Sequence, residues 1–318
     1  MKPITGSWLE FQHHNAAEGT YWNPVCFRFT EEQWRQKVRE MSAFGMDHVV
    51  LLASALDGKA YFDTSLLPRQ EMACGDFLEI LLSEMDACGM RLFMSPGYFG
   101  DWHFPDQNMR SAKVRRREFA AMEELAARYG AHPSFYGWYF PDETGIAGHF
   151  EEEFIDYLNA YCRQVKALNP AYKTLIAPYG TRSAACDGRY AAQLERLEVD
   201  YIAYQDEVGV RKTQVEELPG IYERLKAVHD QVGRSQLWAD VEAFQFEGEV
   251  YHSPLLPAPP QRLRQQLEAV SPYVEKILIY QYQGLLNAPG TSAFCGHPDS
   301  EALYRAWESW REEVAFKK

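Results

Sequence analysis

The segment Phe135–Glu143 reads FYGWYFPDE, an aromatic run typical of a buried strand, and it ends in two carboxylates. A second segment, Gln236–Phe244 (QLWADVEAF), repeats this design with Asp240 and Glu242. Irregular sequence and then a helical pattern follow each of them. Two strands that deliver acids to the same end of a sheet indicate a site for acid and base chemistry.

The same unit of a strand followed by a helix recurs along the whole chain. We expect strands at residues 4–11, 48–55, 91–99, 135–143, 173–179, 200–206, 236–244 and 276–283. Strands that alternate with helices predict a parallel sheet, and eight such units predict a closed barrel. Two of the helices are expected to begin at capping boxes, Thr30–Gln33 and Thr213–Glu216. We therefore predict an α/β protein with a single (β/α)8 TIM-barrel domain over residues 1–318.

The connections between these elements differ in length on the two faces of the predicted barrel. Helix-to-strand connections are short, as at residues 45–47 and 89–90. Strand-to-helix connections are long, as at residues 12–29, 56–75, 100–111 and 245–258. The elaborated loops therefore lie on the C-terminal face of the barrel, where enzymes of this fold keep their active sites.

Composition limits the classes of partner. The chain has 32 Lys and Arg against 45 Asp and Glu, a net charge of −13, so nucleic acid and anionic membranes are disfavoured. No apolar run reaches the length of a membrane span. Six scattered cysteines without a CxxC pair indicate reduced thiols. The N-terminus has no apolar segment of a secretory signal, so we expect a cytoplasmic protein, although a secreted chain that had lost its signal would begin in the same way.

Acidic, amide and aromatic side chains stand at the ends of the expected strands. Carboxylates and amides bind hydroxyl groups, and flat rings stack on the apolar faces of sugars. This set predicts a site for a neutral carbohydrate, and its expected substrate contacts are Glu10, His13, Asp101, Trp102, Asp142, Tyr204, Gln205, Asp206, Asp240, Tyr280 and Gln281.

Glu143 and Glu242 are the expected catalytic pair. In the alternation of Gln236–Phe244, Glu242 shares a face with Trp238 and Asp240, which should be the barrel interior. Hydrolysis of a glycoside needs two carboxyl groups, one protonated to assist the leaving oxygen and one ionised. The aromatic wall beside Glu143 could raise its pKa and keep it protonated. A single such acid would be read as a solvated loop carboxylate, but acids on three strands favour a functional site.

These residues resemble those of a known group of enzymes. The barrel, with one Glu ending its fourth strand and another ending its seventh, is similar to the retaining glycoside hydrolases of clan A. That resemblance implies Glu143 as acid/base, Glu242 as nucleophile, and Tyr204 near the nucleophile. The sequence departs from the clan in having Asp142 where the clan has Asn, and YQYQG at residues 280–284 in place of a Trp.

The full length also resembles a family of glycoside hydrolase-like barrels described as a domain of unknown function. The segments that carry this resemblance are WLEFQHHN (8–15), GWYFPDE (137–143), TLIAPYGTR (174–182), AYQDEVGVRKT (203–213), LWADVE (237–242) and YQYQG (280–284). The resemblance implies the barrel fold and glycosidase chemistry, and it leaves the sugar open.

Two alternatives to a retaining glycosidase stay open from the sequence. Asp206 or Glu207 could act as the base of an inverting enzyme, or the barrel could bind saccharide without cleaving it. We predict neither a metal nor a cofactor, because His13 and His14 are adjacent, whereas metal-dependent hydrolase barrels usually open with the spacing HxH. Oligomeric state is left open.

Overall fold

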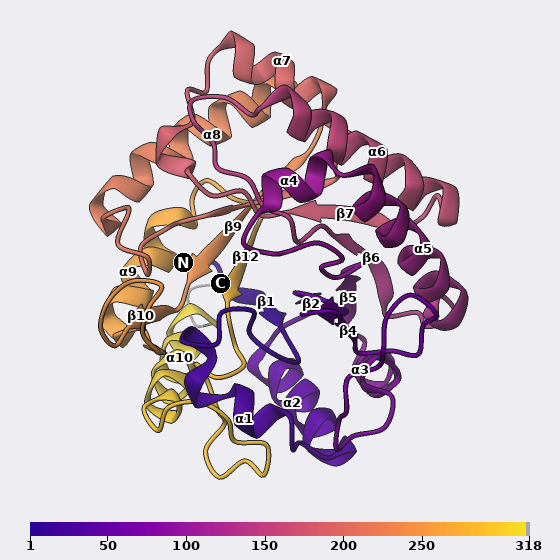
Figure 1. Ribbon diagram of the computed structural model, residues 1–318. Helices are drawn as coiled ribbons and strands as arrows, with labels where there is room; N and C mark the ends of the chain where they lie inside the picture. The colour runs from indigo at the N-terminus through magenta and orange to yellow at the C-terminus, as the bar shows by residue number, and fades with distance from the viewer. Residues whose placement is uncertain (316–318) are drawn as a thin grey trace.

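A computed structural model describes residues 1–315 and shows a closed barrel of eight parallel strands surrounded by helices (Figure 1). The last three residues of the expected domain, and the side chains after Arg311, lie outside the described part. Around the barrel the strands follow the order β1, β12, β9, β8, β7, β6, β5 and β2. Their bounds are β1 Ile4–Leu9, β2 His48–Leu51, β5 Arg91–Met94, β6 Phe135–Tyr139, β7 Lys173–Ile176, β8 Tyr201–Gln205, β9 Gln236–Glu242 and β12 Lys276–Tyr280. The predicted (β/α)8 fold is confirmed.

One main helix follows each barrel strand and packs on the outside of the sheet (Figure 1). These helices are α2 Glu31–Phe44, α3 Phe77–Cys88, α5 Ala112–Tyr129, α6 Glu152–Leu168, α7 Gly188–Arg196, α8 Leu218–Val232, α9 Pro260–Val270 and α10 Ser300–Ala315. The long strand-to-helix loops contain smaller elements that the sequence did not predict. They are α1 Asn23–Cys26, α4 Pro105–Arg110, the hairpins β3 Ala55–Leu56 with β4 Lys59–Ala60 and β10 Phe244–Phe246 with β11 Leu255–Pro257, and short 3-10 turns at 18–21, 181–183 and 215–217.

The two predicted capping boxes had different outcomes. At the start of α2, Thr30 accepts a hydrogen bond from the N–H of Gln33, and the Gln33 side chain accepts one from Thr30 in return, so this box is confirmed. The prediction of a capping box at Thr213 is wrong. The N–H of Thr213 instead donates to the carbonyl of Glu207, and the reciprocal box forms one residue later, between Gln214 and Glu217.

A separate apolar cluster fills the inside of the barrel. Every barrel strand contributes to it, which is the arrangement expected of a packed interior without a channel. Its members are Trp8, Val50, Leu52, Phe93, Tyr139, Leu175, Ala177, Tyr201, Ala203, Trp238 and Leu278. The next inward positions along β8 and β9 are Gln205 and Asp240, which pair across the two strands. Polar side chains therefore begin directly above this apolar cluster.

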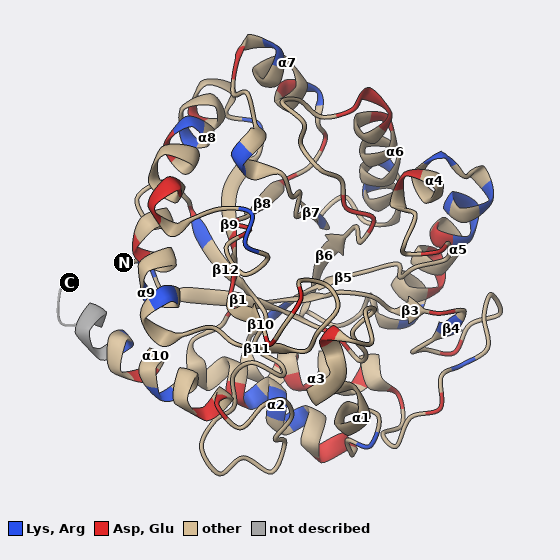
Figure 2. Cartoon of the chain, turned by 60° about the vertical axis from the view of Figure 1, so that its left-hand side comes forward, with Lys and Arg blue, Asp and Glu red and all other residues tan. Residues whose placement is uncertain are grey.

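Charged residues of both signs are spread over the outer helices (Figure 2). Some join neighbouring helices, as where Arg39 of α2 reaches Glu84 of α3 at 2.7 Å. None of the described helices combines the length and apolarity needed to cross a bilayer. All six cysteines are free thiols, and four of them are buried.

Candidate active site

A cavity of about 920 Å³ opens at the C-terminal end of the barrel strands. It is lined by side chains from most of the strand-to-helix loops. Acidic members are Glu18, Asp57, Glu143, Glu207, Asp240 and Glu242; aromatic and imidazole members are His13, His14, Tyr98, Trp102, His103, Tyr179, Phe244, Tyr251, His252 and Tyr280. Gln205 and Lys212 also line it, and this lysine is the one Lys or Arg side chain in the lining.

Glu143 follows the end of β6 and lies partly buried in the cavity wall. Tyr139 donates a hydrogen bond to its Oε1 at 2.5 Å, and Gln205 donates one to its Oε2 at 2.7 Å. Burial raises the pKa of Glu143 to about 7, although both hydrogen bonds act to lower it. A carboxyl group with this pKa can hold or release a proton near neutral pH, as a general acid/base must.

Glu242 is the last residue of β9 and is 4% exposed. Its Oε2 accepts one hydrogen bond, from the N–H of Val210 at 2.8 Å. Burial, followed by the charge of Asp206, raises the pKa of Glu242 well above its usual range.

Asp206 lies behind Glu242 on the side of helix α9. Its Oδ1 accepts from the N–H groups of Val208 and Glu242, each at 3.2 Å, and its Oδ2 accepts from Gln266 Nε2 at 2.6 Å. Burial raises the pKa of Asp206, and the hydrogen bonds from its three donors act to lower it, because they favour the ionised form. Of this adjacent pair, Asp206 therefore holds the negative charge more readily than Glu242.

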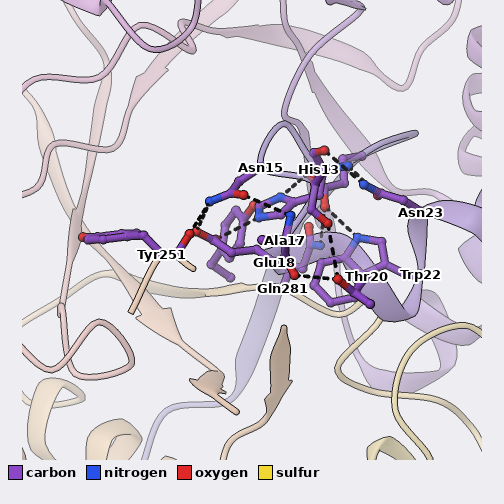
Figure 3. A network of polar contacts seen from close by, with 12 residues as sticks. His13, Asn15, Ala17, Glu18, Thr20, Trp22, Asn23, Tyr251 and Gln281 are labelled. Atoms are coloured by element: carbon purple, nitrogen blue, oxygen red, sulfur yellow. Dashed lines mark hydrogen bonds and ion pairs between the residues drawn. The ribbon is translucent and has the colours of Figure 1, made fainter. Parts of the chain in front are cut away.

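The ring of His13 lies between two carboxylates (Figure 3). Its Nδ1 is 3.1 Å from Glu10 Oε2, and its Nε2 is 3.0 Å from Glu18 Oε2. Burial acts to lower the pKa of His13, but the charges and hydrogen bonds of Glu10 and Glu18 raise it to about 10. His13 is therefore an imidazolium at neutral pH, and Tyr280 Oη lies 3.0 Å from its Nδ1.

Further hydrogen bonds join the first loop to other parts of the cavity wall (Figure 3). Trp22 and Gln281 both donate to Glu10 Oε1, at 2.9 and 2.8 Å. Asn15 donates to Glu18 at 2.7 Å and to the carbonyl of Tyr251 at 2.9 Å. The network thus links the segment after β1 with the segment after β12 and with the β10–β11 hairpin.

Within residues 1–315 one group of side chains has the spacing of a metal site. The ligand atoms of Glu10, His13 and His14 lie within 4.8 Å of one another. Both ring nitrogens of His13 already have carboxylate partners, and Glu10 Oε1 accepts two hydrogen bonds. These contacts fit a protonated His13 better than a coordinated one, because a metal ligand needs a free nitrogen lone pair.

The structure brings together seven of the expected catalytic and substrate-contact residues. Those that line the cavity are His13, Trp102, Glu143, Gln205, Asp240, Glu242 and Tyr280. Glu10 and Gln281 are buried just behind His13, and Asp206 is buried behind Glu242. These three side chains can position cavity residues but do not line the cavity themselves.

Three other expected contacts also lie outside the lining. Tyr204 points away from the barrel interior, because Tyr201, Ala203 and Gln205 take the inward positions of β8; its hydroxyl is 2.9 Å from that of Tyr190 and 3.0 Å from His229 Nε2. Asp142 points toward α4, where Asn108 donates to it at 3.1 Å. Asp101 is exposed and contacts His103 at 2.7 Å.

Sequence reasoning missed several residues of the cavity wall. His14 stands next to the predicted His13, and Glu207, which the sequence indicated only as a possible base of an inverting enzyme, also lines the cavity. Glu207 has a φ of 54°, its Oε2 accepts from the N–H of Thr181 at 3.0 Å, and its Oε1 is 3.6 Å from Lys212 Nζ. Lys212 and Tyr251 lie in long loops, where no periodic pattern indicates direction.

The chain was compared with known proteins in sequence and in fold. The model of the family described as "Domain of unknown function (DUF4434)" matches residues 4–293. No protein of curated function matches the chain by sequence. A structure from Bacteroides thetaiotaomicron VPI-5482, with a provisional assignment as an alpha-L-fucosidase, has a TM-score of 0.77 at 20% identity and covers 98% of this chain and 93% of its own.

Two solved mannanases have the same fold. The endo-beta-1,4-mannanase from Thermotoga petrophila has a TM-score of 0.63 at 9% identity, over 98% of this chain and 76% of its own. The endo-1,4-beta-mannanase from Rhizomucor miehei has a TM-score of 0.59 at 9% identity, over 98% of this chain and 95% of its own. At these identities the likeness shows a common barrel fold, and these neighbours are by name glycoside hydrolases.

Proposed function

This chain belongs to the DUF4434 family, and we propose that it is a glycoside hydrolase that uses Glu143 and Glu242 to cleave a neutral saccharide. One observation carries the proposal: two glutamates from the fourth and seventh barrel strands line a single cavity at the mouth of the barrel. Glycosidic cleavage needs two carboxyl groups beside one bond. The fold shared with glycoside hydrolases supports the same conclusion.

The reaction that we propose retains the configuration of the sugar. Glu143 donates its proton to the oxygen of the leaving group while the carboxylate of Glu242 attacks the anomeric carbon, so the glycosidic bond breaks and a glycosyl ester forms. Glu143, now ionised, takes a proton from water, and the water oxygen bonds to the anomeric carbon as the ester bond breaks. Both carboxyl groups return to their starting states.

The protonation of the pair matters for this reaction. The competent form has a proton on Glu143 and a negative charge on Glu242. Burial favours the proton on Glu143, whereas burial and the charge of Asp206 oppose ionisation of Glu242. Arg262, which donates to the backbone carbonyl of Glu242 at 3.3 Å, acts in the other direction. The competent form is therefore one of several protonation states of the free protein.

The cavity favours a neutral carbohydrate as substrate. Its lining is rich in carboxylates, which repel phosphate and sulfate groups but accept hydrogen bonds from sugar hydroxyls. Trp102, Tyr251 and Tyr280 also line it, and aromatic rings can stack on the apolar sides of sugar rings. The net charge of −13 also argues against nucleic acid.

The test uses E143Q and E242Q on a panel of activated aryl glycosides, with E195Q as a matched control on an exposed position of α7. We expect each active-site variant to lower kcat on a hydrolysed substrate by on the order of a thousandfold or more, and E195Q to behave as the parent. A 2-deoxy-2-fluoro glycoside should label Glu242, which mass spectrometry of peptides identifies. Unchanged rates in both variants would overturn the proposal, and a label on Glu143 would reverse the two roles.

A second candidate mechanism is inversion with Glu207 as the base. Glu207 lines the cavity, its Oε1 accepts no hydrogen bond from a described residue, and Lys212 Nζ lies 3.6 Å from that oxygen. Proton NMR of the first-formed sugar distinguishes the mechanisms. The retaining mechanism requires that the first-formed sugar has the same anomeric configuration as the substrate. The inverting mechanism requires the opposite anomer, together with a large loss of activity in E207Q.

A further inference from the structure

Asp240 has an environment unlike that of the other acids in the cavity. It is 3% exposed and faces into the cavity from the middle of β9, one inward position below Glu242. Its Oδ1 has no hydrogen-bond partner, and no described residue donates to its side chain. A buried carboxylate without donors is costly, because nothing replaces the water that it loses.

The groups around Asp240 are themselves acidic. Glu143 after β6 and Glu242 on the same strand line the cavity with Asp240, and Asp206 after β8 lies behind Glu242. The phenol of Tyr222 on α8, which donates to the carbonyl of Tyr204, also interacts electrostatically with Asp240. Burial, followed by the charges of these three carboxylates, raises the pKa of Asp240 well above its usual range. No Lys or Arg donates to it within the described residues.

The donors available to the four acids differ in number. Asp206 accepts from three donors, Glu143 from two, Glu242 from one and Asp240 from none. Each donor favours the ionised form, so the negative charges of the site collect on the acids that have donors. The acid without donors is the one best suited to keep its proton.

We propose that Asp240 is a neutral carboxylic acid that donates a hydrogen bond to a hydroxyl oxygen of the sugar residue bound beside Glu143. The inference rests on the proposed function for the identity of the ligand, but not for the protonation of Asp240. A neutral acid donates through its O–H, so the carboxyl group recognises an acceptor oxygen. The proton also limits the negative charge beside Glu143 and Glu242, both of which take part in the reaction.

The direct test is the titration of Asp240 in the unmodified protein. Carbon-13 NMR of protein labelled at the aspartate carboxyl carbon, with D240N used to assign the signal, follows ionisation as the pH is raised. We expect the Asp240 signal to stay in its protonated position through neutral pH. A signal in the ionised position at pH 7 would overturn the proposal, whether or not the protein hydrolyses any glycoside.

Kinetics of D240N and D240A test the role of the donated hydrogen bond. Asparagine is close in shape and keeps a donor, so we expect kcat/KM to fall about tenfold in D240N and about a thousandfold in D240A. Because a neutral Asp240 adds no charge, D240N should leave the pH at which Glu143 titrates unchanged. If D240N loses as much activity as D240A, or moves that pH downward, Asp240 acts as a carboxylate and the proposal fails.

Two controls keep these outcomes interpretable. D156N changes an exposed aspartate of α6 and should match the parent in activity and in thermal unfolding. Should D240A not fold, D240N and the titration still decide the matter. If no glycoside is hydrolysed, the proposed function fails, while the NMR titration continues to test the protonation of Asp240.

Discussion

At the scale of single residues, the site depends on how each carboxyl group is solvated. Glu143 is the clearest case, because two side chains of the barrel interior donate to it. Tyr139 belongs to the inner core and packs edge to face against Trp8 at 5.9 Å between ring centroids. Its hydroxyl therefore holds a fixed position, and the pKa of Glu143 reflects a balance between burial and these two donors.

Replacing Tyr139 with Phe should raise the pKa of Glu143. The hydroxyl favours the ionised carboxylate, so its loss favours the protonated form, and the pKa of about 7 should rise by roughly one unit. If Glu143 is the general acid, the alkaline limb of kcat/KM against pH moves to higher pH by the same amount. Y136F is the matched control, because Tyr136 lies on the same strand but contacts Tyr201 instead. An alkaline limb that stays in place or moves to lower pH in Y139F would contradict the assignment of Glu143 as the general acid.

At the scale of elements, the packing of α5 against the end of β6 buries a second pair of acids. Glu118 of α5 is 1% exposed and accepts a hydrogen bond from Tyr161 of α6. Burial, followed by the charge of Asp142, raises the pKa of Glu118 to about 8. Since Asp142 immediately precedes Glu143, this pair supports the segment that carries Glu143 from the side of the helices.

The raised pKa of Glu118 predicts how stability depends on pH. The folded protein binds this proton more tightly than the unfolded chain, whose pKa is about 4.5, so the contribution is present at low pH and is lost as pH rises toward 8. E118Q cannot ionise. We expect the free energy of unfolding of E118Q relative to the parent to increase by on the order of 1–3 kcal/mol between pH 5 and pH 8.5.

Urea unfolding at the two pH values measures this change. E123Q, on an exposed position of the same helix, should show no such difference between pH 5 and pH 8.5. A difference between E118Q and the parent that is equal at both pH values would show that Glu118 does not exchange its proton in this range.

At the scale of the whole molecule, the cavity has aromatic groups on two separate loops. Trp102 follows β5 and stacks on His103 at 3.7 Å between ring centroids. Tyr251 belongs to the β10–β11 hairpin and is 43% exposed. Glu143 and Glu242 line the same cavity, so a saccharide longer than one residue could contact an aromatic ring as well as the acids.

This arrangement predicts that rim aromatics affect long substrates more than short ones. We expect W102A and Y251A each to lower kcat/KM on a hydrolysed oligosaccharide by about tenfold, with a smaller effect on the corresponding aryl monoglycoside. F104A is the matched control, because Phe104 is 51% exposed and lies beside Trp102 but outside the cavity lining. Equal losses on both substrates would show that the rim does not bind distant sugar residues.

The order of strands and helices could be predicted from the sequence because it depends on local patterns. Each barrel strand lies within a predicted segment, and the box at Thr30 caps α2 as expected. The strands stop earlier than predicted, as β6 does at Tyr139. As a result Asp142 and Glu143 lie beyond the hydrogen-bonded part of β6, where neighbouring side chains need not alternate between the two faces of the sheet.

The sequence by itself determined the barrel and the acids at the ends of its strands, because side-chain periodicity and strand-to-helix alternation are properties of the local chain. Only the tertiary structure decided which acids share the cavity. It pointed the side chain of Tyr204 toward the helix layer and placed Asp206 behind Glu242. It also left the side chain of Asp240 without a hydrogen-bond donor. The physical reason is that protonation depends on burial and on neighbouring charges, which come from segments far apart in the sequence.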